Sequence, residues 1–514
     1  MHKTFIRQVP YFEFKGIPFA KPPIGNLRFK APEPIDPWKP KTIDAFEFGN
    51  ACMQDSTRNL YVSENCLYLN IFAPANTNTE KLAVMVFVYG GSFVYGAAQE
   101  FGPTFLMEQN VILVTFNHRV GAFGFLSLGT REYSGNMGLK DQQLAFKWVH
   151  KNIEHFGGDN TRITIMGHSA GAVSALTHLF NDESRTYFQS VISISGVMLH
   201  SYPTGNHKCI FYEIARNLTQ TITNDTELIE FVTTMPAQQL LSYTLQPFLL
   251  ETLLHFPVWG PKMEDKNDIR PIITMDPHKV LQNGHFHNKS IYFTHTSREM
   301  FLFESEESLK YENVQNAIDT FDDIHLPHYA FDLAAIANIP LNSKPYLKNL
   351  LNKVRNYYFE NVSGEYDTVL KYVDMQSDFV LNYYMDKSTQ QFLSSAPSIY
   401  YSRFSVDSTL NMAKQRMNLT LPGASHADDL CYIFMCHSVE SLYKYIVATK
   451  STNINSSVSL TAIDRMTKLF GNFVKYGNPT INNDPVHGVK EVGWGQLNYL
   501  DVTNDGLQVD QSPS

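Results

Sequence analysis

Residues 162–180 read RITIMGHSAGAVSALTHLF, and this stretch decides the fold. Its first five residues, RITIM, predict a strand, and the segment after Ser169 has the pattern of a helix. Between them, Gly167-His168-Ser169-Ala170-Gly171 is the one G-x-S-x-G match in the chain. In this pattern a strand turns sharply into a helix and exposes the serine hydroxyl. Ser169 is therefore the candidate nucleophile, and the alternative is a glycine-flanked turn with a capping serine.

Strands and helices alternate on both sides of this stretch. Apolar runs predict strands at 82–89 (LAVMVFVY), 111–116 (VILVTF), 190–195 (SVISIS), 291–294 (IYFT) and 398–404 (SIYYSRF). Helical patterns cover 141–153 and 461–475, and HFGGDN at 155–160 predicts a loop. This alternation indicates an α/β fold with a mainly parallel sheet covered on both faces. We interpret the helix-rich region 205–400 as insertions into that core rather than as a separate domain.

A second glycine pattern, Tyr89-Gly90-Gly91-Ser92-Phe93, follows the strand predicted at 82–89. Attack by a serine nucleophile on a carbonyl needs backbone N–H groups that point at the developing oxyanion, and glycines let such a loop come close to a substrate. We expect Gly91, Ser92 and Ala170 to donate these N–H groups, with Gly90 in a supporting position behind them. Without the serine motif, an ordinary Gly-Gly loop would be the better interpretation.

The composition excludes several classes of protein. Hydrophobic residues make up 43% of the 514 residues and charged residues 18%, which excludes intrinsic disorder over most of the length. The 41 basic and 50 acidic residues give a net charge of −9, so we expect no nucleic-acid partner. No apolar stretch approaches the length of a transmembrane helix.

Several blocks of the chain resemble the type B carboxylesterases, the family that includes the cholinesterases and insect esterases. The similar blocks are FKGIPFAKPPIGNLRFKAPEP (14–34), SENCLYLNIFAP (63–74), NHRVGAFGFL (117–126) and NMGLKDQQLAFKWVHKNIEHFGGD (136–159). The resemblance implies an α/β-hydrolase fold with large helical insertions and a single domain over residues 1–514. His168 and the GASHADDL block (423–430) are most similar to the insect α-esterases.

The resemblance also implies a Ser-Glu-His triad. THTSREMFLF (294–303) is similar to the family's acid block and places the acid at Glu299; GASHADDLCYIF (423–434) places the base at His426. The residues alone do not distinguish Glu299 from Glu304, Glu306 or Glu307, nor His426 from the other histidines. The order Ser, Glu, His is the order found in α/β-hydrolases.

Several positions depart from the family pattern, and two of them lie at or next to predicted site residues. Ser92 stands where the family usually has a third glycine, and Met300 follows Glu299 where glycine is usual. The family also implies a disulfide between Cys52 and Cys66, worth roughly 3 kcal/mol for so short a loop. The alternative is a pair of reduced thiols in a cytosolic protein. No pairing is assigned to Cys209, Cys431 or Cys436.

The expected substrate is a small carboxylic ester of the xenobiotic, dietary or odorant type, hydrolysed without a cofactor or metal. Residues 53–65 lack the tryptophan that binds choline in cholinesterases, and His168 replaces their glutamate before the nucleophile. Choline esters are therefore disfavoured. A juvenile-hormone-type esterase is an alternative, although those enzymes usually have glutamine before the serine. A neuroligin-like adhesion protein is the alternative from another class, disfavoured because all three triad positions are filled.

Six N-glycosylation sequons begin at Asn217, Asn224, Asn288, Asn361, Asn418 and Asn455. They favour a secreted or ER-luminal glycoprotein over a cytoplasmic one. The first ten residues have no apolar core of signal-peptide length. Because family members usually carry a β-hairpin ahead of the 14–34 block, a leader could lie outside this sequence, and its absence does not decide the compartment. We expect a monomer or a weak homodimer.

Overall fold

A computed structural model of the chain describes residues 1–38, 40–55, 60–75, 80–198, 206–254, 258–283, 288–320, 344–393, 396–480 and 498–511. These residues form an 11-stranded sheet in the order β1-β2-β5-β8-β6-β9-β10-β11-β12-β14-β15. The strands are β1 (His2–Lys3), β2 (Pro10–Pro18), β5 (Tyr68–Pro74), β6 (Leu82–Val88), β8 (Ile112–Phe116), β9 (Gly158–His168), β10 (Ser190–Ile194), β11 (Ser290–Thr296), β12 (Ile399–Phe404), β14 (Asn498–Val502) and β15 (Leu507–Gln511). All pairings from β8 to β14 are parallel, and the pairings at the two edges are antiparallel.

The central strands are apolar because they are buried on both faces. All five residues of β8 and six of the seven residues of β6 are buried, so neither strand shows the alternation of a half-exposed strand. Their register aligns the carboxyl ends: Val88 of β6 is opposite Gly167 of β9, and His168 is opposite Ile194 of β10. Ile194 is in turn opposite Thr294 of β11. The loops that follow these four strands therefore begin side by side.

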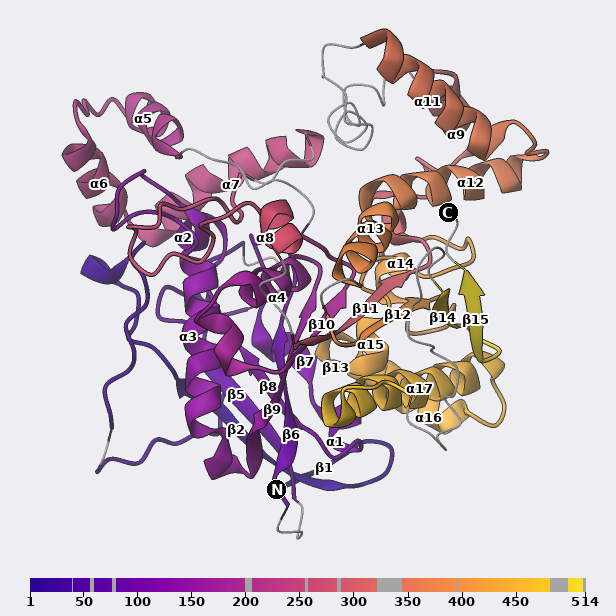
Figure 1. Cartoon of the computed structure of the whole chain (residues 1–514), viewed down its shortest axis with the longest axis horizontal. Coiled ribbons are helices and arrows are strands. Elements are labelled where there is room, and N and C mark those ends of the chain that lie inside the picture. Colours follow the sequence, from indigo (N-terminus) through magenta and orange to yellow (C-terminus); the bar gives the residue numbers. More distant parts are fainter. Residues whose placement is uncertain are drawn as a thin grey trace.

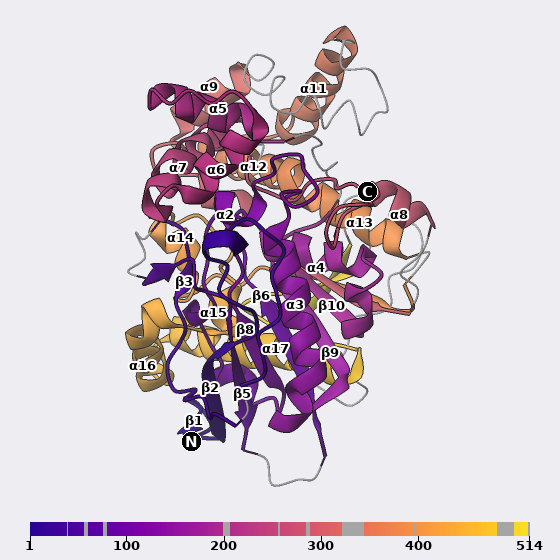
Figure 2. The ribbon, with the colours of Figure 1, turned by 90° about the vertical axis from the view of Figure 1, so that its left-hand side faces the viewer.

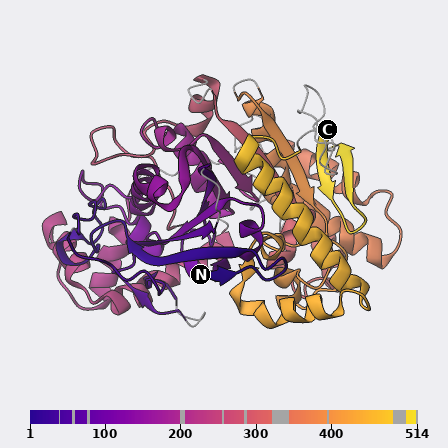
Figure 3. The same cartoon turned by 90° about the horizontal axis from the view of Figure 1, so that it is seen from below.

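Helices cover both faces of this sheet (Figures 1 and 3). On one face, α3 (Met137–Asn152) and α4 (Ala170–Phe180) pack against β9. On the other, α17 (Ile454–Tyr476) packs against β6 and β9 and also contacts α16 (Glu440–Thr449). Among the described helices, none is both long enough and apolar enough to cross a membrane.

The inserted helices lie at one end of the molecule, which is the upper end in both Figure 1 and Figure 2. They are α5 (Lys208–Asn217), α6 (Asp225–Thr234), α7 (Ala237–Leu254), α9 (Tyr311–Asp319), α11 (Lys344–Phe359) and α12 (Glu365–Ser377). Residues of α9, α11 and α12 share an apolar cluster that includes Phe301 and Leu419. The prediction of a helix-rich region at 205–400 is confirmed for its described residues.

Most predicted elements are confirmed, and the main differences concern a loop, a helix start and several strands. The loop predicted at 155–160 is partly wrong: β9 already begins at Gly158, because that residue pairs with Leu82 of β6. The helix predicted at 461–475 begins at Ile454, where the Asn453 side chain caps it by accepting from the N–H groups of Asn455 and Ser456. Five strands of the sheet were not predicted: β1, β2 and β5, which form its antiparallel edge, and β14 and β15, whose polar residues form strands by pairing with β12 and with each other.

Candidate active site

Ser169 lies at the turn between β9 and α4 with φ 55° and ψ −123°, a conformation that non-glycine residues rarely adopt. Its N–H donates to the carbonyl of Ile194 over 2.8 Å, and its own carbonyl accepts from the N–H of Ala172 over 2.9 Å. A Cβ atom at Gly167 would overlap the carbonyl oxygen of Gly171, so this turn requires glycine there. The strained conformation predicted from the G-x-S-x-G motif is confirmed.

The Gly-Gly loop after β6 lies directly against this turn. A Cβ atom at Gly90 would come within 2.8 Å of the Ser169 Cβ. Gly91 has φ 113°, and its carbonyl accepts from the N–H of Val94 over 2.9 Å, which closes the loop into a turn. Ser92 follows with φ 52° and is exposed. The structure thus brings the two predicted glycine motifs together.

The three predicted N–H donors belong to these two turns. Gly91 and Ser92 lie in the loop after β6, and Ala170 is the first residue of α4. Within the described part of the chain, no carbonyl or side chain accepts a hydrogen bond from these three N–H groups. They are therefore available to an oxygen atom of a ligand, and the helix N-terminus at Ala170 adds positive potential.

Glu299 begins a 3-10 helix, Glu299–Phe303, just after β11, and only 2% of its surface is exposed. Its Oε1 accepts from the hydroxyl of Ser195 over 2.6 Å and from the N–H of Thr296 over 2.7 Å. Its Oε2 accepts from Nδ1 of His426 over 2.6 Å. Burial opposes ionisation, but the charge and hydrogen bond of His426 and the hydroxyl of Ser195 outweigh it and lower the pKa of Glu299 to about 2.

The other acidic residues of this segment lie elsewhere. Glu304 accepts from the Ser308 hydroxyl over 2.6 Å, and Glu306 accepts from the Asn418 amide over 2.7 Å. Glu307 pairs with Lys310 at the surface. Of these carboxylates, Glu299 is the one in contact with the His426 imidazole. The structure thus favours Glu299 within the acidic cluster, which the residues alone could not do.

His426 lies in a loop between α14 (Met412–Arg416) and α15 (Leu430–Ile433), and its side chain is 16% exposed. Burial lowers the pKa of His426, but the charge of Glu299 and the hydrogen bond to it have the larger combined effect and raise it above its ordinary value. The His426 ring is 4.7 Å, centroid to centroid, from the ring of His168, the residue before Ser169. Within the described structure, however, no hydrogen bond joins the Ser169 hydroxyl to His426. Such bonds are often long in a free enzyme and tighten on substrate binding.

Three polar groups beside this pair were not predicted. Ser195 follows β10 with φ 49° and hydrogen-bonds Glu299; its position at the end of a predicted strand was the available signal. Asp428 and Asp429 follow His426 and are fully buried. Burial raises the pKa of each carboxyl to about 7. Among the described residues, neither carboxylate oxygen of Asp429 has a hydrogen-bond partner.

The structure contains two disulfides. Cys52 is bonded to Cys66, as the family resemblance implied, and Cys431 is bonded to Cys436. Cys209 is exposed and unpaired among the described cysteines. The described residues include no group of three or more His, Cys, Asp or Glu side chains that could hold a metal ion.

A cavity of about 350 Å³ opens beside the far end of α4 rather than at Ser169. Thr177, Phe180 and Ile272 line it together with Arg270. Ser169, Glu299 and His426 are not among its lining residues. The loops that project from the carboxyl ends of β6, β9, β10 and β11 are arranged as in the α/β-hydrolases.

Comparisons with known proteins define the class further. The Carboxylesterase family matches residues 2–513. Juvenile hormone esterase of Tribolium castaneum is 30% identical over 518 residues, which cover 95% of this chain and 82% of that protein. Esterase B1 of Culex pipiens is 28% identical over an alignment that covers 97% of this chain and 91% of that protein. The crystal structure of juvenile hormone esterase from Manduca sexta, with OTFP covalently attached, has a TM-score of 0.81 at 25% identity, covering 100% of this chain and 94% of that chain.

The chain has the α/β-hydrolase fold, and it belongs to the carboxylesterase family. It is a carboxylic ester hydrolase, and the alternative of a non-catalytic adhesion protein is set aside.

Proposed function

We propose that Ser169 is the nucleophile, His426 the general base and Glu299 the acid of a catalytic triad. The observation that carries this proposal is the hydrogen bond of 2.6 Å between His426 and Glu299 beside the strained Ser169 turn. The three residues come from distant parts of the sequence and meet at neighbouring strand ends. This spread also supports the proposal that residues 1–514 fold as one domain.

In the first half of the reaction, the Ser169 hydroxyl attacks the ester carbonyl carbon while His426 Nε2 takes its proton. The carbonyl oxygen becomes an oxyanion, which the N–H groups of Gly91, Ser92 and Ala170 stabilise. The imidazolium then gives its proton to the leaving alkoxide, so the alcohol departs and an acyl-enzyme remains. Water, deprotonated by His426, attacks the acyl-enzyme, and proton return to Ser169 releases the carboxylic acid.

Glu299 supports these steps without exchanging a proton. Its pKa of about 2 keeps it ionised throughout the working pH range. Because it accepts from Nδ1 of His426, Nε2 of the neutral imidazole faces the nucleophile with its lone pair. When the imidazolium forms, the buried carboxylate stabilises the new positive charge.

For the substrate, we propose small esters of the xenobiotic, dietary or odorant type. The loop closed by Cys52 and Cys66 contains no tryptophan, and His168 beside the nucleophile is kept neutral because burial lowers its pKa. Neither feature offers a site for a quaternary ammonium group. Juvenile hormone is the second candidate, since relatives from Tribolium castaneum and Heliothis virescens, each 30% identical, are juvenile hormone esterases.

Two experiments test these proposals. A fluorophosphonate probe should label the protein once, at Ser169, as located by peptide mapping; labelling at another serine would refute the assigned nucleophile. Hydrolysis rates for p-nitrophenyl esters from acetate to laurate, compared with those for juvenile hormone and acetylcholine, would then define the substrate. A kcat/KM for juvenile hormone far above every p-nitrophenyl ester would replace the first candidate with the second.

We also propose that the protein is glycosylated and is a monomer or weak homodimer. All six sequon asparagines are exposed, so a glycan could be accommodated at each. A mass decrease after enzymatic removal of N-glycans from protein of a secretory host would support glycosylation, and an unchanged mass would refute it. Light scattering over a concentration series would measure the oligomeric state.

A further inference from the structure

The loop that carries His426, here called the histidine loop (residues 421–428), lies outside helices and strands, so other contacts must fix its backbone. One side of it is tied to the acid segment. The N–H of Arg298 donates to the carbonyl of Ala424 over 2.9 Å, and the N–H of Ala424 donates to the hydroxyl of Ser297 over 3.0 Å. The N–H of His426 donates to the carbonyl of Glu299 over 3.3 Å. These contacts hold only one edge of the loop.

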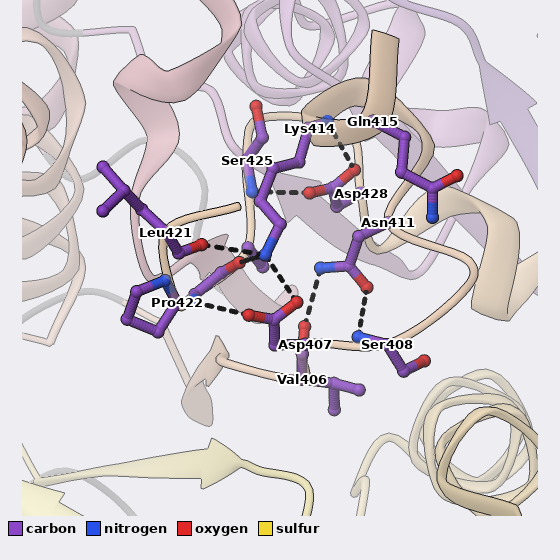
Figure 4. A network of polar contacts seen from close by, with 12 residues as sticks. Val406, Asp407, Ser408, Asn411, Lys414, Gln415, Leu421, Pro422, Ser425 and Asp428 are labelled. Atoms are coloured by element: carbon purple, nitrogen blue, oxygen red, sulfur yellow. Dashed lines mark hydrogen bonds and ion pairs between the residues drawn. The ribbon is translucent and has the colours of Figure 1, made fainter. Parts of the chain in front are cut away.

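Lys414 holds the opposite edge, as Figure 4 shows. It lies in α14 and is 5% exposed. Its Nζ donates to the Leu421 and Gly423 carbonyls, each over 3.0 Å, and to Asp407 Oδ1 over 2.5 Å. An ammonium group has three N–H donors, so these bonds satisfy it completely. Two of the three partners belong to the histidine loop.

Two carboxylates complete this framework. Asp407 Oδ2 accepts from the N–H of Gly423 over 3.2 Å, so Lys414 and Asp407 together bind both backbone groups of that residue. Asp428 Oδ2 accepts from the N–H of Ser425 over 2.7 Å (Figure 4). Its Oδ1 accepts from the N–H of Ala413, also over 2.7 Å. The framework therefore contacts the loop on both sides of His426.

The loop needs this support because parts of its backbone are unfavourable. Ala427, directly after His426, has φ 72°, which a non-glycine residue adopts only when its surroundings enforce it. Without the Lys414 ammonium, two carbonyls and the Asp407 carboxylate would each lose a charged donor. The loop would relax to regain solvation, and His426 would move with it.

We propose that Lys414 is a positioning residue for catalysis, acting through the backbone of the histidine loop to hold the His426 imidazole between Glu299 and Ser169. This inference rests on the proposed role of His426. A displacement of about 1 Å at a catalytic group can cost on the order of 100-fold in rate. Lys414 itself need not contact the substrate, so its loss should affect kcat rather than KM.

The test compares Lys414→Met with Lys140→Met, a matched control. Lys140 is also buried, at 2% exposure, and its Nζ binds Glu264 over 2.8 Å and Ser134 over 2.9 Å, but it touches no residue of the histidine loop. For each variant, active sites are titrated with a fluorophosphonate, and kcat and KM for p-nitrophenyl acetate are measured well below the melting temperature. The rate constant for phosphonylation of Ser169 is measured as a second readout of nucleophile activation.

Both substitutions should lower the melting temperature. Only Lys414→Met should lower kcat per titrated site, by about 10- to 100-fold, with KM within about threefold of the wild-type value and phosphonylation slowed by a similar factor. A wild-type kcat per titrated site in Lys414→Met, or an equal loss in Lys140→Met, would overturn the inference.

If Lys414→Met does not fold, Asp407→Asn offers a milder change that keeps the Lys414 bonds to Leu421 and Gly423. A loss of about 3- to 10-fold in kcat per titrated site would support the inference, and no loss would overturn it. These results do not test the proposed nucleophile. That is tested separately by Ser169→Ala, which should abolish activity whether or not Lys414 is a positioning residue.

Discussion

The Ser195 hydroxyl donates a hydrogen bond of 2.6 Å to the Glu299 carboxylate, on the oxygen opposite the one that binds His426. Ser195 follows β10 and Glu299 follows β11, and the parallel register of these strands brings the two residues together. With the N–H of Thr296, Ser195 fixes the orientation of a carboxylate that is 2% exposed. Glu299 is thus held ionised and oriented before any substrate arrives.

Ser195→Ala should lower kcat about tenfold, because one hydrogen bond to a buried carboxylate is worth about 1.5 kcal/mol. KM should change little, since Ser195 faces the acid rather than the acyl site. Ser190→Ala is the control: Ser190 is the first residue of β10, the strand that Ser195 follows, and it hydrogen-bonds the Thr164 hydroxyl instead. Steady-state kinetics on p-nitrophenyl acetate measure the difference, and equal losses in both variants would exclude a specific role for Ser195.

Glu299→Gln should lower kcat by roughly 10⁴, because the neutral amide no longer stabilises the imidazolium and can favour the wrong tautomer. Glu304→Gln should leave activity within a few-fold of wild type. If Glu304→Gln were the crippling change, the assigned acid would be wrong.

Glu299→Gln also tests the pH dependence of kcat/KM. His426 works as a base only when neutral, and Glu299 raises its pKa above 6.5, so wild-type kcat/KM should fall as the pH drops through that raised value. Removing the Glu299 charge should move this acidic limb to lower pH. A pH profile of kcat/KM measures it, and an unmoved limb would mean that another group controls it.

Ser92→Gly should raise kcat/KM for bulky acyl esters by about tenfold, equivalent to 1–2 kcal/mol, and change acetate esters little. The N–H donor is kept, while the strain of a serine at φ 52° is removed together with a side chain that we expect to crowd the acyl group of the substrate. The p-nitrophenyl ester series provides the measurement. A loss of about 100-fold on every ester would instead identify the Ser92 hydroxyl as an oxyanion donor.

Asp429→Asn should stabilise the protein in alkaline solution. Burial, with the neighbouring charges of Glu299 and Asp428, raises the pKa of Asp429 to about 7, although His426 opposes the shift. A folded-state pKa above the unfolded value gives stability that is complete at low pH and is lost as the pH rises through about 7. At pH 8.5 the wild type therefore carries a buried carboxylate without a described hydrogen-bond partner.

We expect Asp429→Asn to raise the free energy of unfolding by about 1–3 kcal/mol at pH 8.5 and by clearly less at pH 5, because the difference builds up between the unfolded pKa of about 4 and the folded pKa of about 7. Denaturant unfolding at the two pH values measures this difference. Asp428→Asn is the contrast. Its raised pKa alone would predict a gain at pH 8.5, but both Asp428 oxygens accept backbone N–H groups, three in all, and an amide NH₂ cannot accept, so this variant should lose stability at both pH values. Destabilisation by Asp429→Asn at pH 8.5 would mean that its carboxylate has a favourable partner.

The elements that could be predicted from the sequence are those specified by a pattern within a short segment of the chain. The apolar runs that became β6, β8 and β10 are buried on both faces, and the helix predicted at 170–180 matches α4. The Ser169 turn was predictable because a short glycine spacing specifies its geometry. Strands β14 and β15 had no such signal, since pairing with a distant strand makes them strands.

The residues of the candidate site likewise fall into those that the sequence indicated and those that only tertiary contacts reveal. Glu299 and His426 were identified by resemblance to family blocks, and nothing in their local sequence separated them from other acids and histidines. Ser195, Lys414 and Asp428 act through contacts between distant segments or through the exact path of a loop backbone. Such contacts depend on tertiary structure, so the hydrogen bonds that support the histidine loop cannot be predicted from the sequence alone.

The most direct test of the account is the turnover of Ser169→Ala on p-nitrophenyl acetate, measured on protein with a wild-type melting curve. We predict a loss on the order of 10⁶ in kcat, because a triad that acts as a unit loses nearly all its chemistry with its nucleophile. Activity retained near the wild-type level in Ser169→Ala would contradict the account.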